Sequence, residues 1–358
     1  LSLAFNNIRK LLLDKKVDDA FLEFQHAQET ITPNSNINSI DILRNTSRYD
    51  TYVDKSKDFS SYYISTGFKE LDNIMGGIDR REDFGLIMAR TNSGKSFIAL
   101  KMALASVKQG LNVGLYSGEM SETKVGYRFD TLDSHINCGS LMHGNTNVQS
   151  DYKKYIDNLP NKYKGRLEVL TPSGNQGGKN ATVSDLRAFI EQKKLDILFI
   201  DQISLLDDER KGKTTNECVS NISKDIKRLQ VMLKKPIIVV TQQNRNKNED
   251  EDTLDTSQVA LSDRLSQDAT FILGITRDKK DTTIMKIHTV KLRDGSISRP
   301  LEYIVDLGTG KFEYIPTEEE MEHIADINSE SEESQSDDIE FSVEDRDNQE
   351  YFDDDMPF

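Results

Sequence analysis

The stretch Ala89-Arg90-Thr91-Asn92-Ser93-Gly94-Lys95-Ser96 decides the fold of this chain of 358 residues. It matches the phosphate-binding loop GxxxxGK[ST], except that alanine replaces the first glycine. An apolar run at residues 85–90 predicts a strand before the loop, and residues 96–109 predict an apolar helix after it, which ends at Gly110. Strand, loop and helix in this order are the context that the motif requires. We therefore interpret the stretch as a nucleotide site.

The second half of the loop carries the chemistry of phosphate binding. Gly94 allows backbone amides to close around phosphate oxygens, Lys95 reaches the β- and γ-phosphates, and Ser96 supplies a hydroxyl for magnesium. The N-terminus of the following helix adds a dipole that favours an anion. We expect Ala89 to Ser96 to bind ATP, or another NTP or dNTP, together with Mg²⁺.

Short β-branched runs alternate with helical stretches between Thr66 and Thr317, which is the pattern of a mainly parallel sheet with crossover helices. A capping box at Thr182 and Asp185 predicts one helix start, and residues 216–234 predict another helix. Alternation with turns over residues 283–315 predicts antiparallel hairpins. The fold class is therefore α/β, with six main strands expected at residues 85–90, 112–117, 167–171, 196–201, 236–242 and 270–276.

Three polar side chains stand at the ends of three of these predicted strands: Glu119, Asp201 and Gln242. In an open parallel sheet, ligands bind at the carboxyl ends of the strands, so the three should lie near the phosphate loop. Asp201 is the candidate acid for the magnesium shell, Glu119 could polarise the attacking water, and Gln242 could contact the γ-phosphate. Taken singly, each could instead be a capping or surface residue.

The charge of the chain is very uneven. Residues 317–358 contain 18 Asp or Glu and one basic residue, Arg346, so they account for more than the total net charge of −15 and leave residues 1–316 near neutral. Such a segment is too acidic and too poor in apolar residues to fold. We predict three parts: an N-terminal helical linker or packing arm (1–60), the ATPase core (61–316) and an acidic disordered tail (317–358).

Within the arm, two amphipathic helical patterns, around Phe5 and around Phe24, precede a polar linker at residues 32–58. Cys138 and Cys218 are far apart and form no CxxC pair, which favours a reducing compartment and implies no zinc site. The apolar runs are too short to span a bilayer and no signal peptide is recognised, so a cytoplasmic protein without membrane contact is expected. The chain begins with Leu1 rather than Met, as a trimmed chain or a fragment would.

The order of motifs resembles replicative DNA helicases of the DnaB family. Residues 65–72 (Ser-Thr-Gly-Phe to Leu-Asp), the phosphate loop, Tyr-Ser-Gly-Glu-Met at 116–120, Leu-Phe-Ile-Asp at 198–201 and Thr-Gln-Gln-Asn-Arg at 241–245 look like the family's successive motifs. The alanine that opens the phosphate loop is also usual there. The resemblance covers residues 60–316 and implies a RecA-like core, a homo-hexameric ring with nucleotide between subunits, and single-stranded DNA in the central channel.

Carried over onto this sequence, the resemblance gives roles to the candidate residues. Glu119 would be the catalytic base, Asp201 the magnesium-shell acid and Gln242 the γ-phosphate sensor. Arg293 would be an arginine finger that acts on the neighbouring subunit's nucleotide, with Lys291 as a second cation; a finger supplied in trans is worth about 10³ to 10⁵ in rate. Without the other motifs, Lys291 and Arg293 would be interpreted as solvated charges of a hairpin.

Two loops are candidates for contact with DNA. Arg210, Lys211, Gly212 and Lys213 follow the strand of Asp201, in a loop that faces the channel in the family. The second loop, residues 244–264, is acidic at 249–252 and departs from the family's pattern, so no DNA contact is assigned to it. Neither loop has aromatic residues for base stacking, which leaves salt-sensitive phosphate contacts.

The function expected from these observations is an ATP-dependent replicative DNA helicase that translocates on single-stranded DNA as a ring and unwinds duplex DNA. One alternative on the same fold is a filament-forming recombinase similar to RecA and RadA. Another is a loader or adaptor that uses nucleotide only as a switch, although such a module needs no Glu119, Asp201 and Arg293 set. Primase and DNA polymerase, or other replisome proteins, are the expected partners.

The end of the tail has its own signature. Asp353, Asp354 and Asp355 precede Met-Pro-Phe358, which is similar to the acidic tip of bacterial single-stranded DNA-binding proteins. Phe358 would offer an apolar ring and a carboxylate to a hydrophobic pocket rimmed by basic residues, while the aspartates steer the approach. We expect this tip to bind a replication partner, such as the polymerase, and to compete with DNA for basic loops of the ring in the partner's absence. A tail that only solubilises the chain is the alternative.

Overall fold

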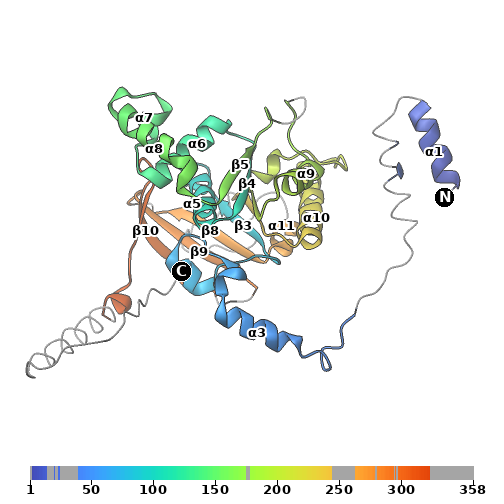
Figure 1. Ribbon diagram of the computed structural model, residues 1–358, viewed down its shortest axis with the longest axis horizontal. Coiled ribbons are helices and arrows are strands. Elements are labelled where there is room, and N and C mark those ends of the chain that lie inside the picture. The colour runs from blue at the N-terminus through green and yellow to red at the C-terminus, as the bar shows by residue number, and fades with distance from the viewer. Residues whose placement is uncertain are drawn as a thin grey trace, which may run out of the picture. The chain divides into compact units, whose positions relative to one another are not determined.

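The computed structural model describes residues 2–13, 20, 23–24, 39–174, 178–243, 263–278, 280–293, 295 and 297–322, and the chain divides into two units, Leu1–Lys57 and Asp58–Phe358 (Figure 1). The first unit contains α1 (Ser2–Leu13) and α3 (Ser47–Lys57). α1 confirms the first predicted amphipathic helix. α3 lies inside the stretch predicted as a polar linker and contains no buried residue. Its N-terminal amide, at Ser47, is capped by the side chain of Asn45 (2.9 Å), and Lys55 and Lys57 complement the dipole at its other end.

The second unit is built on a nine-stranded sheet in the order β11-β10-β9-β8-β3-β7-β6-β4-β5 (Figure 1). The pairs from β8 through β3 to β5 are parallel, whereas β8, β9, β10 and β11 pair antiparallel. This confirms the predicted α/β fold with terminal hairpins, and each of the six predicted main strands is observed to within one residue. The strands are β3 (Phe84–Ala89), β4 (Asn112–Ser117), β5 (Arg166–Leu170), β6 (Ile197–Asp201), β7 (Ile237–Gln242), β8 (Phe271–Arg277), β9 (Ile284–Leu292), β10 (Leu301–Asp306) and β11 (Lys311–Tyr314).

Helices cover both faces of the sheet and create two cores. On β3, Ile87 and Ala89 belong to the core with α5 and α6, while Leu86 and Met88 belong to the core with α9, α10 and α11. Strands buried on both faces have continuous apolar sequences, which explains why β3 was recognisable as Phe-Gly-Leu-Ile-Met-Ala. The helices of this unit are α4 (Lys69–Met75), α5 (Lys95–Lys108), α6 (Glu122–Ser134), α7 (Cys138–Met142), α8 (Gln149–Lys162), α9 (Val183–Lys193), α10 (Thr215–Leu233) and α11 (Asp263–Asp268).

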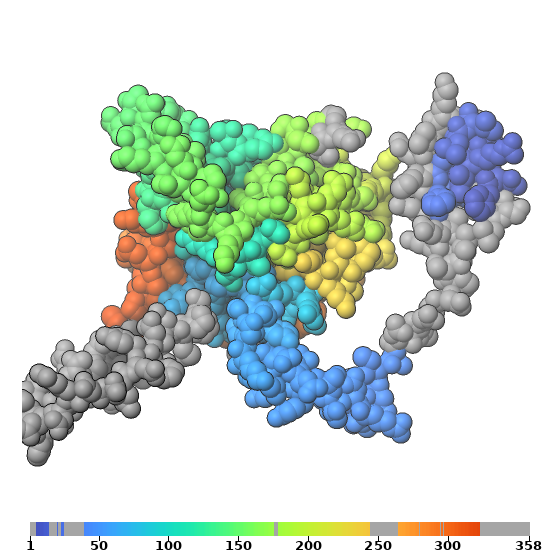
Figure 2. All heavy atoms as spheres, viewed as in Figure 1, coloured from blue at the N-terminus to red at the C-terminus, as the bar shows by residue number. Residues whose placement is uncertain are grey.

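The predicted helix starts are confirmed, but several elements were not predicted. Thr182 and Asp185 form the expected capping box at the start of α9. The helices of residues 122–162 were not anticipated, nor was the small antiparallel hairpin of β1 (Tyr63–Ile64) and β2 (Ile78–Asp79). α8 lies on the surface, in green in Figure 2, and has no buried residue, so its sequence lacks an apolar stripe that could have revealed it. None of the described helices is both long and apolar enough to cross a membrane.

The first turn of the acidic tail is ordered. The carboxylate of Glu320 accepts hydrogen bonds from the Thr317 amide (2.9 Å) and the Tyr314 hydroxyl (2.8 Å), and it pairs with Arg299 at 2.8 Å. These donors, the Thr317 amide first, lower the pKa of Glu320 to about 2. The tail is therefore anchored to the β11 edge of the sheet before it continues. Residues 323–358, with the predicted partner-binding tip at Asp353, Asp354, Asp355 and Phe358, lie outside the described residues.

Candidate functional site

The phosphate loop joins β3 to α5 at the edge of the sheet formed by the C-terminal ends of the parallel strands, here called the carboxyl edge. Asn92 and Gly94 have positive φ values of 64° and 94°, and Gly94 caps α5, accepting hydrogen bonds from the amides of residues 97 and 98. Asparagine tolerates the left-handed region and glycine adopts it without a steric cost. Lys95 is buried to 8% exposure at the first position of the helix. The predicted loop of Ala89 to Ser96 thus has the shape of a phosphate cradle.

Asp201 ends the buried strand β6 beside the start of α5. Its side chain is 2% exposed, and its Oδ1 atom has no hydrogen-bond partner among the described residues. Burial raises the pKa of Asp201, and the Ser96 hydroxyl and the charge of Lys95 act in the opposite direction. Lys95 and Ser96 therefore meet Asp201 at one point, as predicted, although more than 100 residues of sequence separate them from it.

Glu119 and Gln242 also lie at the carboxyl edge. β4 pairs with β6 so that Ser117 is opposite Asp201, and Glu119 follows two residues later; its charge contributes to the raised pKa of Asp201. The Glu119 side chain is exposed, which leaves it accessible to a bound substrate. Gln242 is opposite Ala89 in the pairing of β7 with β3, so it lies directly beside the phosphate loop. All three strand-end residues are brought to the loop.

Two further buried polar atoms at this edge have no partner among the described residues. They are the amide oxygen of Gln202 and the hydroxyl of Thr241, which belong to residues that are 5% and 1% exposed. Buried polar groups are nearly always hydrogen-bonded, so unpaired ones in a cluster indicate a place for a polar ligand or its water shell. Sequence reasoning missed both residues, although each adjoins a predicted site residue.

Two arginines beside the site were also missed. The charge of Arg128, on α6, lowers the pKa of Asp201, and its guanidinium lies 5.1 Å from the centre of the Phe97 ring. The Nη2 atom of Arg277, at the end of β8, lies 3.5 Å from the point where a Cβ atom on Gly94 would stand. Burial lowers the pKa of the Arg277 guanidinium. The signal for Arg277 was its position at the end of the strand next to β3.

The donors at this edge fit a magnesium ion. Mg²⁺ prefers oxygen ligands and usually takes only one or two protein carboxylates, completing its shell with water and substrate phosphates. Asp201 supplies a carboxylate with an unpaired oxygen and Ser96 a hydroxyl beside it. Among the described residues no group of three or more His, Cys, Asp or Glu could hold a metal ion. A metal ion at the carboxyl edge would therefore depend on nucleotide phosphates and water for its remaining ligands.

Lys291 and Arg293 lie at the opposite edge of the sheet, here called the amino edge. Arg293 donates its amide to the carbonyl of Thr270 (3.0 Å), and Thr270 in turn contacts Phe84, the first residue of β3. The phosphate loop begins after Ala89, five residues further along β3, roughly 17 Å away at 3.3 Å per residue. The exposed Arg293 therefore lies far from the phosphate loop of its own chain.

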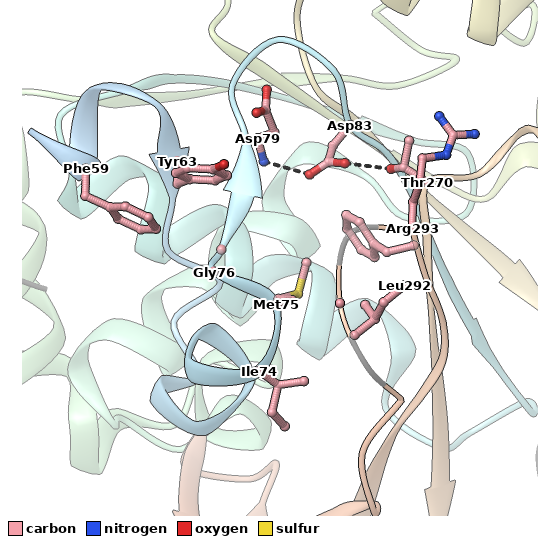
Figure 3. Close-up of a pocket in the computed structure, with 13 residues that line it drawn as sticks. Phe59, Tyr63, Ile74, Met75, Gly76, Asp79, Asp83, Thr270, Leu292 and Arg293 are labelled. Carbon is pink, nitrogen blue, oxygen red and sulfur yellow. Dashed lines mark hydrogen bonds between the residues drawn. The ribbon is translucent and has the colours of Figure 1, made fainter. Parts of the chain in front are cut away.

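A pocket of about 300 Å³ adjoins Arg293 at the amino edge (Figure 3). Its walls include the stacked rings of Phe59 and Tyr63, whose centres are 4.5 Å apart, and Asp83, which accepts hydrogen bonds from Asp79 and Thr270. Figure 3 shows Arg293 on its rim beside Thr270.

The ammonium of Lys291 is already bound within its own chain. It donates to the carbonyls of Ser266 (2.8 Å) and Ala269 (2.7 Å) at the end of α11. Burial, followed by the charge of Arg293, lowers the pKa of Lys291. Lys291 thus stabilises the C-terminus of α11 in the single chain, while Arg293 extends beyond it.

The predicted DNA-binding loop lies at the carboxyl edge, between β6 and α10. Lys211 and Lys213 are exposed, whereas the Arg210 guanidinium is paired with Asp225 of α10. Gly212 is needed for packing, because a Cβ atom there would lie 2.8 Å from the amide nitrogen of Cys218. The two lysines are therefore the cations of this loop that are most available to a ligand. Residues 244–262 of the second candidate loop lie outside the described residues.

Comparisons with known proteins agree with this arrangement. The chain is 28% identical over 257 residues to a probable plasmid replicative DNA helicase of Chlamydia psittaci, covering 70% of this chain and 55% of that protein. It is 29% identical over 248 residues to the replicative DNA helicase DnaB of Geobacillus stearothermophilus, covering 65% and 53%. The chain thus spans about half the length of these relatives.

Solved structures show the same fold. A DnaB-like replicative helicase, described with its interactions with primase, gives a TM-score of 0.63 at 21% identity, covering 87% of this chain and 75% of that one. A separate ATPase domain superposes with a TM-score of 0.64 at 23% identity, covering 76% and 100%. These likenesses establish the RecA-like ATPase fold. The family model for the DnaB-like helicase C-terminal domain matches residues 63–306, more than half of the sequence, and the chain therefore belongs to that family.

Proposed function

We propose that this chain is the motor of an ATP-dependent replicative DNA helicase, which translocates on single-stranded DNA as a homo-hexameric ring. The observation that carries the proposal is the division of the site between two edges. Lys95, Ser96 and Asp201 meet at the carboxyl edge, while Arg293 stands at the amino edge, exposed and roughly 17 Å from its own phosphate loop. A complete catalytic set requires a second subunit that presents its amino edge to the first subunit's nucleotide.

Each residue then has a role set by its position. Backbone amides of the loop and the buried Lys95 hold the phosphates, and Glu119, accessible beside Asp201, takes a proton from the attacking water. Gln242, beside Ala89, contacts the γ-phosphate and reports its loss. Arg293 of the adjacent subunit neutralises charge on the transferred phosphoryl group. Ser96 and Asp201 would hold Mg²⁺, which supplies electrostatic stabilisation of the phosphate oxygens when bound.

DNA would be held at the carboxyl edge by the exposed Lys211 and Lys213, close to the nucleotide. Phosphate contacts of this kind carry no base specificity, as a motor that moves along any sequence requires. A primase and a DNA polymerase are the proposed partners, and the tip of Asp353, Asp354, Asp355 and Phe358 is the proposed contact for the second. A cytoplasmic location fits such a machine.

Two substitutions at the carboxyl edge test the proposal. Lys95→Ala should abolish nucleotide binding, whereas Glu119→Gln should keep binding and lose turnover, because one residue holds the phosphates and the other activates the water. Lys154→Ala, on the exposed surface of α8, is the control and should leave both unchanged. Nucleotide titration, steady-state ATPase rates and strand displacement on forked DNA give the readouts. Parent-rate hydrolysis by Glu119→Gln would remove that residue from the catalytic role.

The assembly separates this proposal from the recombinase and switch alternatives. Electron microscopy of the chain with single-stranded DNA and a nucleotide analogue should show closed rings. A continuous filament on DNA would favour the recombinase. Nucleotide binding without hydrolysis, in the presence of DNA, would favour the loader or adaptor.

A further inference from the structure

A second pocket, unrelated to the nucleotide site, opens between α5 and β11. Its volume is about 450 Å³, and its lining combines apolar side chains with cations. Leu132 and Phe312 form part of the wall, while Lys101, Lys108 and Lys311 supply positive charge. Glu313 is the one carboxylate among the described residues that line it. This combination suits a ligand that carries both carboxylates and apolar side chains.

Lys101 is the unusual member of the lining. Its half-buried ammonium lies 5.0 Å from the centre of the Phe68 ring and 5.1 Å from that of Phe312, between two aromatic faces. Burial, followed by the charge of Lys108, lowers its pKa, and the more distant charge of Glu70 acts weakly in the opposite direction. A partly desolvated cation without a counter-ion in direct contact is a costly arrangement. An acidic ligand in the pocket would supply that counter-ion.

The other charges around the pocket are more nearly balanced. Lys108 pairs with Asp133 at 3.3 Å but remains half-exposed, and the exposed Lys311 lies near Glu313 along β11. His135 uses its Nδ1 atom on the carbonyl of Thr309 (3.0 Å). The field of the pocket therefore depends mainly on Lys101 and Lys311.

The acidic segment of the same chain begins next to this pocket. Lys311 and Phe312 lie on β11, and the ordered turn anchored by Glu320 follows that strand directly (Figure 1). The 36 residues that follow, 323–358, contain 14 Asp or Glu and one Arg, together with apolar residues such as Phe341 and Phe352. A random coil of this length has an end-to-end distance of roughly 30 Å, so the local concentration of such a segment at the pocket would be in the millimolar range.

We propose that the pocket of Lys101, Lys108, Lys311 and Phe312 is a docking site for the acidic segment 323–358 of its own chain. Carboxylates of the segment pair with Lys101 and Lys311, and an apolar side chain packs on Leu132 and Phe312. The segment is then held on the body of the protein until a partner with a stronger basic surface competes for it. This inference does not depend on helicase activity, because it concerns a different part of the molecule.

Lysine reactivity in the full chain tests the proposal. The parent is compared with a full-length variant in which the 14 Asp and Glu of residues 323–358 are replaced by Asn and Gln. Both are acetylated under limiting reagent, and modified lysines are quantified by mass spectrometry. Lys101 should react several-fold more slowly in the parent, and the difference should vanish at high salt, where exposed charges are screened. Lys153, 74% exposed on α8, is the internal control and should react equally in both proteins. Equal rates for Lys101 in the two proteins would overturn the proposal.

Carbodiimide cross-linking identifies the occupant. Links from Lys101 or Lys311 to residues 323–358 should exceed those from Lys153, and Lys101→Ala with Lys311→Ala should abolish the pocket's links. Three results would overturn the assignment: links distributed by exposure alone, links confined to Lys211 and Lys213, or links found only between isotopically distinct chains in a mixture. Protection of Lys101 in the neutralised variant by an added single-stranded oligonucleotide would make the pocket a nucleic-acid site instead.

Discussion

Replacing Asp201 by asparagine should stabilise the nucleotide-free protein while it abolishes turnover. The carboxylate is 2% exposed, and its Oδ1 atom has no partner among the described residues. A buried charged group left unpaired costs about 1–3 kcal/mol, and Ser96 and Lys95 offset part of this. An amide is easier to bury, so we expect a gain of about 1–2 kcal/mol in the free energy of unfolding. At about 2–4 °C per kcal/mol for a folded unit of this size, the melting midpoint should rise by about 2–8 °C.

The effect should depend on pH. Burial raises the pKa of Asp201 above its ordinary value of 3.8, so the folded state binds the proton more tightly than the unfolded state. The burial cost is therefore absent below 3.8, grows as the pH rises through the folded-state pKa, and is complete above it. The advantage of Asp201→Asn over the parent should be largest near about pH 8 and shrink as the solution is acidified.

The assay is thermal unfolding by calorimetry, with and without Mg²⁺ and a non-hydrolysable ATP analogue. Asp196→Asn is the matched control, because Asp196 precedes the same strand but pairs with Lys235 (3.1 Å) and accepts the Asn112 amide (3.0 Å). That variant should not gain stability. A lower midpoint for nucleotide-free Asp201→Asn than for the parent would refute the idea that the carboxylate is held unpaired for a ligand. Equal stabilisation of both proteins by nucleotide with Mg²⁺ would refute its place in the metal shell.

Three other substitutions test separate parts of the molecule. Arg293→Ala should bind nucleotide but fail to hydrolyse it, and mixing it with Lys95→Ala subunits should restore some ATPase activity; no recovery at any ratio would exclude action in trans. Lys211→Ala with Lys213→Ala should weaken single-strand binding and reduce the slope of log affinity against log salt by about 2, measured by fluorescence anisotropy. Gly85→Ala should lower the free energy of unfolding by about 1–3 kcal/mol in chemical denaturation, because its Cβ would lie 2.2 Å from a ring carbon of Phe271.

The parts of the fold that were predictable are those fixed by local sequence. β3 and β6 are continuous apolar runs because both of their faces are buried, and the phosphate loop between β3 and α5 has a fixed spacing of residue types. The positions of Glu119 and Asp201 followed from strand order alone, since carboxyl ends of parallel strands share one edge. These inferences needed no knowledge of side-chain packing.

The residues that were missed depend on tertiary proximity. Arg128 reaches the site from α6, a helix that was not predicted, and Arg277 approaches Gly94 because β8 pairs with β3. Neither residue belongs to a spaced motif. The ordered turn at Glu320 was missed for a different reason: composition predicted disorder for the whole tail, whereas Arg299 and Tyr314 supply the specific partners that hold its start.

The placement of the phosphate loop and Arg293 at opposite edges of the sheet also constrains how the motor can assemble. If Arg293 acted on its own nucleotide, the amino edge would have to close over the length of β3, which is impossible because β3 is the buried centre of the sheet, with every residue buried. A neighbour can meet the requirement by rotation alone, with its amino edge placed against the first subunit's carboxyl edge. Such a contact joins two different surfaces, so it generates a ring if the rotation closes and a helix if it does not. Lys291, which is held by α11 carbonyls in the single chain, then fixes the strand end from which Arg293 extends toward the neighbour.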